Sequence, residues 1–320
     1  MRMAPDQVGI FALATLRQLS AFSVTGGAGG QALAWSRAGW LAVGVNDGVQ
    51  LWNTGSSPAL MRTLTGITGY VKGLAVSADG RYVAATTYIQ PKSGLGYGDE
   101  GQLAVWEAGS GRRLSTFNLG TNGRPVAFSP DAPILATAMG NNQTLVFDYL
   151  HGRVVKKIKA LVQDITGNGS PQSVVGLAFL ANGDLLMGED SGVVETVNPQ
   201  TGVAAQHPIE AEQATVTSVS VLPDQSSFVT TSSNGQPALW DASTLQQFGS
   251  TFPGSLGDSS TTAVTPDGKY LVVVYGDGSG YVWPLGLSAW MNHACAVARR
   301  NLTQEEWSRF VPGQPYQTIC

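Results

Sequence analysis

The amino-acid sequence predicts an all-β protein built from one repeated four-stranded unit. In residues 232–245 a turn signal, Asn234-Gly235, precedes a short apolar run that ends at Trp240-Asp241. Two-residue turns of the Asn-Gly type join antiparallel strands, because both central residues adopt positive φ at low cost. A second signal, a small residue followed by Asp or Asn and often Gly, recurs along the chain, and glycine is abundant at 40 residues. Both observations indicate many short strands joined by tight turns.

The turn-plus-aromatic signal has further copies, the weakest of which ends in valine. These copies end at Trp52, Trp106, Phe147, Val197 and Trp283. One such unit cannot bury its apolar face alone, so the repetition implies an array of sheets packed side by side.

The second turn signal gives the length of the repeat. Six anchor positions, taken as equivalent, lie 41 to 52 residues apart: Ser36, Ser77, Ser129, Leu180, Leu222 and Thr265. Four strands are expected around each anchor, for example 71–76, 82–86, 103–106 and 113–117 in the second repeat. Their alternation of apolar and polar residues is partial, as expected for strands that are covered on both faces.

In its period, its four strands and its turn anchor, the chain resembles the WD-repeat (WD40) family over roughly residues 31–285. The resemblance implies an all-β, WD40-like β-propeller of six or, alternatively, seven four-stranded blades with a short C-terminal helical tail. Only Trp240-Asp241 keeps the Trp-Asp ending, and the Gly-His pair of the family is missing. The family's Asp–His–Ser/Thr–Trp hydrogen-bond network is therefore not carried over.

The two ends of the repeated region determine how such a ring closes. The last repeat has three expected strands, 261–264, 270–274 and 281–283, whereas the first residues look like the third and fourth strands of a repeat. Pairing of residues 15–22 beside 281–283 would close the ring and remove its exposed edges. We therefore expect a propeller over residues 1–286, with ring-closing strands in 1–30. The surplus strand 8–11 leaves open a seven-bladed protein that lacks one half-blade.

Residues 287–320 do not continue the repeat and predict a C-terminal helical tail. Ser288 can cap a first helix, and Thr303 with Glu306 forms a capping box for a second one. The apolar Trp290 and Trp307 favour a tail that is packed on the propeller. The tail also resembles the segment after the last blade in bacterial WD-repeat signalling proteins, which carry an N-terminal STAND-type nucleoside triphosphatase, protease-like or kinase module. No such module is recognisable here.

Composition argues against two classes of partner. The formal net charge is −4, from 18 Lys and Arg against 22 Asp and Glu, and a chain without a basic cluster is a poor match for nucleic acid. No apolar run approaches the roughly 18 residues of a membrane span. We expect a cytoplasmic protein, although the low charge and a surface rich in Ser, Thr, Asn and Gln leave an exported fate open.

The sequence predicts no catalytic residue, cofactor or metal. It contains no phosphate-binding loop, no H-E-x-x-H, no C-x-x-C and no G-x-S-x-G. His293, Cys295 and Cys320 supply only three potential metal ligands, and core and cap positions are the simpler interpretation. The two cysteines alternatively form a disulfide in an oxidising setting.

Two insertions indicate a binding face. They cover 88–100, between the second and third strands of the second repeat, and 160–172, between the third and fourth repeats. In a WD-type propeller such loops share one rim, and long loops on a rigid scaffold commonly carry recognition, although neutral drift in loop length is the simpler explanation. The candidate binding residues are Tyr88, Gln90, Lys92, Tyr97, Asp164, Thr166 and Asn168. The tyrosines are the expected anchors.

Two classes of function remain. The first is a non-enzymatic scaffold or sensor that binds a protein or peptide in a bacterial signalling system. The alternative is a propeller enzyme, a hydrolase or lyase, with its site at the central channel. Few histidines and few charges, 12% of residues, speak against the enzyme. A converging cluster of carboxylates, histidines or arginines at the channel mouth would favour it, since propellers host both functions.

Overall fold

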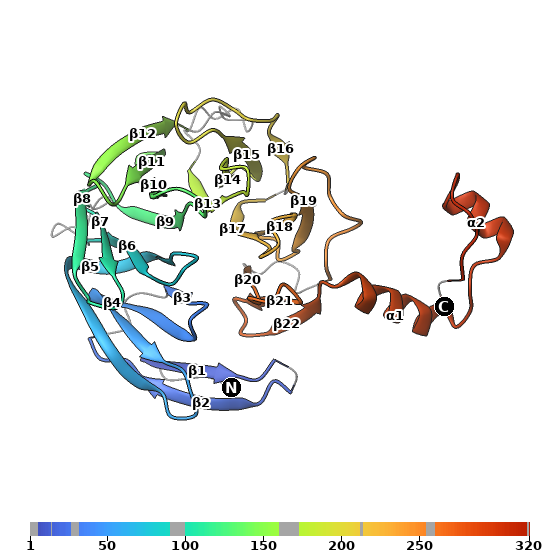
Figure 1. Ribbon diagram of the computed structural model, residues 1–320, viewed down its shortest axis with the longest axis horizontal. Coiled ribbons are helices and arrows are strands. Elements are labelled where there is room, and N and C mark those ends of the chain that lie inside the picture. Colours follow the sequence, from blue (N-terminus) through green and yellow to red (C-terminus); the bar gives the residue numbers. More distant parts are fainter. Residues whose placement is uncertain are drawn as a thin grey trace.

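Sheets arranged in a ring make up most of the molecule (Figure 1). The computed structural model describes residues 6–13, 15–26, 32–89, 100–159, 173–211, 214–253, 260–318 and 320. These residues form five sheets of three or more strands, a separate two-stranded hairpin and two C-terminal helices. The innermost strands of successive sheets lie next to one another, as in a β-propeller.

The largest sheet has six strands: β3 (Leu33–Trp35), β4 (Trp40–Asn53), β5 (Ala59–Val76), β6 (Tyr82–Tyr88), β7 (Gln102–Glu107) and β8 (Arg113–Asn118). Two four-stranded sheets follow, formed by β9 (Gly123–Phe128), β10 (Ile134–Met139), β11 (Gln143–Asp148) and β12 (Arg153–Lys159), and by β13 (Val174–Phe179), β14 (Leu185–Glu189), β15 (Val193–Val197) and β16 (Ile209–Glu210). The last two have three strands each, namely β17 (Val216–Val221), β18 (Ser227–Ser232) and β19 (Ala238–Asp241), and then β20 (Ser260–Val264), β21 (Tyr270–Tyr275) and β22 (Gly280–Pro284). All pairings between these strands are antiparallel.

Within the described residues the structure shows five blades, so the prediction of six or seven separate four-stranded blades is wrong. The repeats anchored at Ser36 and Ser77 share the six-stranded sheet, because β4 pairs with β3 and β5, and β5 continues to β6. The pair Asn46–Tyr70 bridges the point where the two repeats meet. There Asp47 has a φ of 62°, and its carboxylate accepts a hydrogen bond from the backbone N–H of Gly69 at 2.7 Å. This local bend joins the two expected blades instead of separating them.

The predicted turn anchor is confirmed as a repeated hydrogen-bond motif. The Ser77 hydroxyl donates to the Asp79 carboxylate at 2.6 Å and accepts from the backbone N–H of Tyr82 at 2.9 Å. In the last sheet Thr265 donates to Asp267 at 2.5 Å in the same way. These contacts close the turn between the first two strands of a repeat, which is where the sequence places it.

The core lies between successive sheets. In one cluster, Leu103 and Val105 of β7 pack with Leu135 of β10 and with Leu145 and Phe147 of β11, all at most 1% exposed. Burial of one such side chain contributes about 1.5–3 kcal/mol, and similar clusters join the other neighbouring sheets. The sheets therefore stabilise one another laterally, as the repeat pattern requires.

The N-terminal residues form a hairpin of their own, so the predicted ring closure is wrong. Within the described residues, β2 (Gln18–Ser23) pairs with β1 (Gln7–Phe11) and not with β22. Phe22 is buried against β4, and its ring stacks on Trp52 with centroids 4.3 Å apart. Burial against β4 thus takes the place of the expected pairing beside β22. The sequence also predicted that these residues resemble the third and fourth strands of a repeat. A hairpin that precedes the first repeat agrees with that prediction.

The tail begins with α1 (Leu287–Ala298), which follows β22 and leads away from the ring to α2 (Gln304–Phe310) (Figure 1). Trp290 reaches back, and its indole N–H donates to the Pro284 carbonyl at 2.5 Å. Trp307 is 8% exposed, but it packs on Tyr316 and donates to the Gln314 carbonyl at 3.0 Å, so these two contacts lie within the tail. This arrangement differs from the tail packed along the propeller that the sequence led us to expect.

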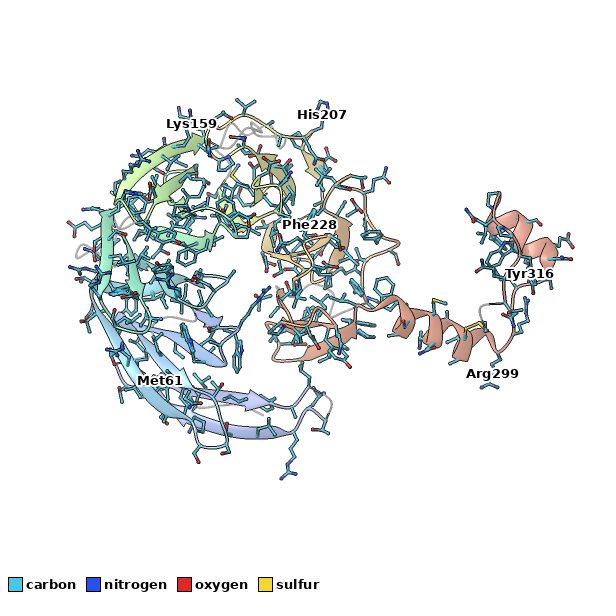
Figure 2. The ribbon with its side chains drawn as sticks, in the orientation of Figure 1. Met61, Lys159, His207, Phe228, Arg299 and Tyr316 are labelled. Carbon is cyan, nitrogen blue, oxygen red and sulfur yellow. A yellow bond between two sulfur atoms is a disulfide. The ribbon has the colours of Figure 1, made fainter. Side chains whose placement is uncertain are left out.

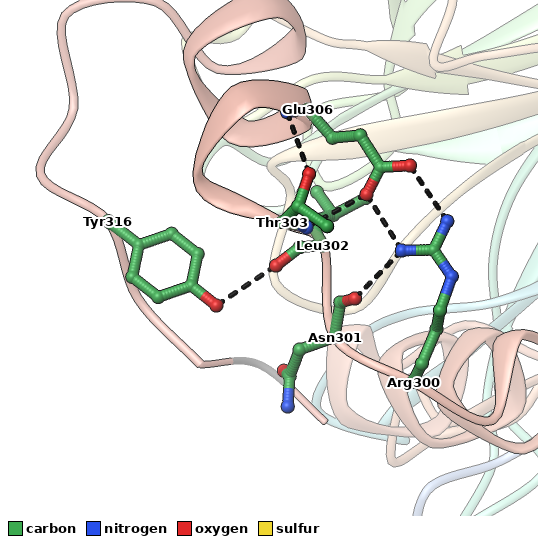
Figure 3. Close-up of polar contacts among 6 residues, drawn as sticks. All are labelled: Arg300, Asn301, Leu302, Thr303, Glu306 and Tyr316. Carbon is green, nitrogen blue, oxygen red and sulfur yellow. Dashed lines mark hydrogen bonds and ion pairs between the residues drawn. The ribbon is translucent and has the colours of Figure 1, made fainter.

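The predicted capping box is present at the start of α2 (Figure 3). The Glu306 backbone N–H donates to the Thr303 hydroxyl at 3.2 Å, and the Thr303 N–H donates to the Glu306 carboxylate at 2.8 Å. That carboxylate also accepts two hydrogen bonds of 2.7 Å from Arg300, which together with the cap lower the pKa of Glu306 to about 2. A disulfide between Cys295 and Cys320, with Cα atoms 5.3 Å apart, links α1 to the chain end beyond α2 (Figure 2).

Candidate binding site

Four inner strands of the ring, β5, β9, β13 and β17, share an irregularity in their pairing. In three of them the pairing ladder skips a single residue, which is Lys72 in β5, Val175 in β13 and Thr217 in β17. In β9 the ladder skips Arg124 and Pro125. A β-bulge of this kind turns a side chain out of the normal alternation of a strand. Equivalent positions of successive repeats therefore come together around the ring.

A cavity of about 330 Å³ lies at these bulges, a size typical of small-ligand sites. Three successive sheets contribute to it, since its lining residues are Lys72, Tyr88, Asn122, Gly123, Arg124, Pro125, Gly140 and Val175. β9 contacts both β5 and β13, so the three inner strands hold the cavity on a rigid framework.

Lys72 and Tyr88 form one wall. The Lys72 ammonium lies 5.9 Å from the centroid of the Tyr88 ring, within the range of a cation–π contact. Tyr88 ends β6 and pairs with Tyr70, and a Cβ placed on Gly69 would lie 2.4 Å from the Tyr88 carbonyl oxygen. Close backbone approach thus fixes Tyr88, while Lys72 remains exposed to solvent.

Arg124 and Asn122 supply the second wall. The Thr86 hydroxyl donates to the Arg124 carbonyl at 2.6 Å, and a Cβ on Gly73 would lie only 2.3 Å from that oxygen. Among the described residues, no carboxylate forms an ion pair with Arg124 or Lys72. Asn122 is 8% exposed, and its side-chain oxygen has no hydrogen-bond partner in the described part of the chain. The two walls together therefore offer two positive charges and one buried amide.

No family model matches the chain. The β-propeller domain of Cps50 (Swd1) from Myceliophteria thermophila is a similar solved structure, with a TM-score of 0.64 and 15% sequence identity. The match covers 80% of this chain and 83% of that chain. The fold is a β-propeller. At this identity the likeness shows the fold alone, and the cavity must be interpreted from its own residues.

Of the seven candidate residues, only Tyr88 belongs to the described part of this β-propeller, and it lines the cavity. The other six, Gln90, Lys92, Tyr97, Asp164, Thr166 and Asn168, lie outside the described residues. Their convergence on one rim therefore remains a prediction. Tyr88 begins the first insertion and Val175 follows the second, and both line this cavity.

Sequence reasoning missed Lys72, Arg124 and Asn122. A signal for the first two was present, because each lies between a buried residue and a glycine or proline, as in Val71-Lys72-Gly73. Aligning the repeats on this pattern would have placed Lys72 and Arg124 at equivalent positions of neighbouring repeats. Asn122 carried no such signal, since its importance depends on burial.

A second cavity of about 240 Å³ lies where the inner strands end, and Trp35, Arg37 and Gln225 are among its lining residues. Neither cavity is lined by a described carboxylate or histidine, and the described residues contain no cluster of three metal-binding side chains. Glu189 and Glu195 do lie together, but both are fully buried within β14 and β15. Within the described residues, no helix is long and apolar enough to cross a membrane.

Proposed function

We propose that this WD40-like propeller is a non-enzymatic scaffold that binds a protein or peptide segment at the bulge-lined cavity. The cavity carries the proposal, because it combines an aromatic ring, two cations and a buried amide on three rigid strands. Aromatic and arginine side chains in such positions are the usual anchors of protein recognition. The insertions that flank Tyr88 and Val175 would extend this surface.

The resemblance of the tail to bacterial WD-repeat signalling proteins supports a role as the sensing part of a bacterial signalling system. The tail is stabilised by its own contacts, notably the disulfide between Cys295 and Cys320. Disulfides persist in oxidising compartments, so this bond supports an exported location over the cytoplasmic one expected from composition.

Selection of peptides from a random library on the immobilised protein tests this function. We expect enriched peptides whose affinity, measured by calorimetry, falls at least about tenfold in the variant Tyr88→Ala, Tyr97→Ala, because truncation of an anchor weakens binding strongly. The melting temperature should stay unchanged. Tyr270→Ala is the matched control, since Tyr270 lies 40% exposed on β21 and does not line the cavity. Equal affinity in all variants would refute binding at this face.

A further inference from the structure

We propose that the cavity holds a carboxylate of the peptide ligand between Lys72 and Arg124. This inference rests on the proposed function and specifies its ligand chemistry. The carboxylate belongs to an acidic side chain or to a peptide C-terminus, which share the same chemistry at this site.

Two like charges lie in one cavity because of the repeat architecture. Lys72 and Arg124 occupy equivalent bulges of β5 and β9, and these two strands contact each other directly. Neither cation forms an ion pair with a described carboxylate, although acidic residues outnumber basic ones in the whole chain. An anion between them would satisfy both charges at once and form charge-assisted hydrogen bonds.

Asn122 also lines the cavity. Its buried side-chain oxygen lacks a partner among the described residues, and the backbone is fixed because the Asn122 carbonyl accepts a hydrogen bond from Gly140 at 2.9 Å. A peptide N–H close to the carboxylate would supply the missing donor. A carboxylate adjacent to a backbone amide therefore matches both walls, whereas a free inorganic anion matches only the cations.

The remaining lining favours a carboxylate over a phosphate group. Phosphate sites usually add several convergent backbone N–H groups from a helix N-terminus or a glycine-rich nest. Here the cavity is lined by strands and strand ends, with Pro125 and Val175 as apolar walls for the carbon chain of an acidic residue.

Selection from two random peptide libraries tests the inference, one library with free C-termini and one with amidated C-termini. Wild-type protein should enrich aspartate and glutamate from the amidated library, or peptides with a free terminus from the other, and either result identifies the source of the carboxylate. The variant Lys72→Gln, Arg124→Gln should lose this preference. Replacing the acidic residue by its amide, or amidating the terminus, should weaken binding at least about tenfold in wild type and little in this variant.

Arg17→Gln, Lys157→Gln is the matched control, because it removes the same charge from exposed positions outside the cavity. Its acidic preference should equal that of wild type, and all variants should melt at the same temperature.

The possible failures are distinguishable. If no peptide is enriched by any variant, the proposed function itself is wrong. If peptides are enriched without an acidic preference, or if the preference survives in Lys72→Gln, Arg124→Gln, the carboxylate site is wrong while peptide binding stands. Binding of a phosphoserine peptide at least about tenfold tighter than its glutamate counterpart would replace the carboxylate by a phosphate.

Discussion

The stability of the third sheet should depend on pH through Glu189. This residue ends β14, and both Glu189 and Glu195 are 0% exposed. Burial raises the pKa of Glu189 to about 9, and the hydrogen bond to Glu195 and the negative charge of that residue act in the same direction. The Ser191 hydroxyl donates to Glu189 at 3.2 Å, which opposes the shift without cancelling it. The folded protein therefore keeps a proton on this carboxyl at neutral pH.

The sign and size of the effect follow from linkage. Between the ordinary value of 4.5 and about 9, the folded chain binds a proton that the unfolded chain has released. The free energy of unfolding contributed by this group is complete below pH 4.5, and it falls by about 1.4 kcal/mol for each pH unit until the pH passes the folded pKa. From pH 5 to pH 7 the expected loss is about 2.5 kcal/mol.

The variant Glu189→Gln removes this titration and keeps a donor for Glu195. Urea unfolding of wild type and variant at pH 5, 6, 7 and 8 measures the effect. The variant should lose less stability as the pH rises, so the two curves should diverge. Glu210→Gln, exposed on β16 of the same sheet, should follow wild type. Parallel curves for wild type and Glu189→Gln would refute a proton held on this carboxyl.

Two further predictions concern backbone approach and the tail. Gly73→Ala should lower the free energy of unfolding by about 1–3 kcal/mol, because its Cβ would lie 2.3 Å from the Arg124 carbonyl oxygen, and urea unfolding would measure this loss. Gly109→Ala, whose Cβ has no atom within 4 Å, is the control, and an equal effect of both changes would contradict the steric argument. Cys295→Ser should destabilise the tail by about 3.5 kcal/mol through loss of a bond that closes 25 residues, while the propeller melts as before. Fluorescence of Trp307 follows the unfolding of the tail. Unchanged protection of the backbone amides of the tail from hydrogen exchange would contradict the prediction.

Local signals in the sequence were sufficient for the turns and the caps. The contact between Ser77 and Asp79 and the capping box at Thr303 depend on residues only a few positions apart, so their geometry is encoded locally. The closure of the ring is not local. Phe22 buries its apolar side chain on β4 as well as it would beside β22. No local sequence pattern distinguishes these two placements. The pairing of Asn46 with Tyr70, which merges two repeats, is likewise not encoded by a local sequence pattern.

The candidate site was partly predictable for the same reason. Tyr88 was found because it begins a long insertion, which is visible in the sequence. Lys72 and Arg124 required the register of β5 and β9, since a residue one position away would point to the other side of the strand. The role of Asn122 depends on a missing partner, and only coordinates show that.

The bulge position also explains why the cavity occupies one sector of the ring. Lys72 and Arg124 are charged there, and Val175 provides an apolar boundary. In the next repeat Thr217 occupies the equivalent place, but its hydroxyl donates to the Ser260 carbonyl at 2.6 Å and so ties β17 to β20. The same bulge therefore links two neighbouring sheets at Thr217, whereas at Lys72 and Arg124 it presents charged groups to a ligand. Because the fold needs the bulge but not a particular side chain, recognition can vary at this position without changing the propeller.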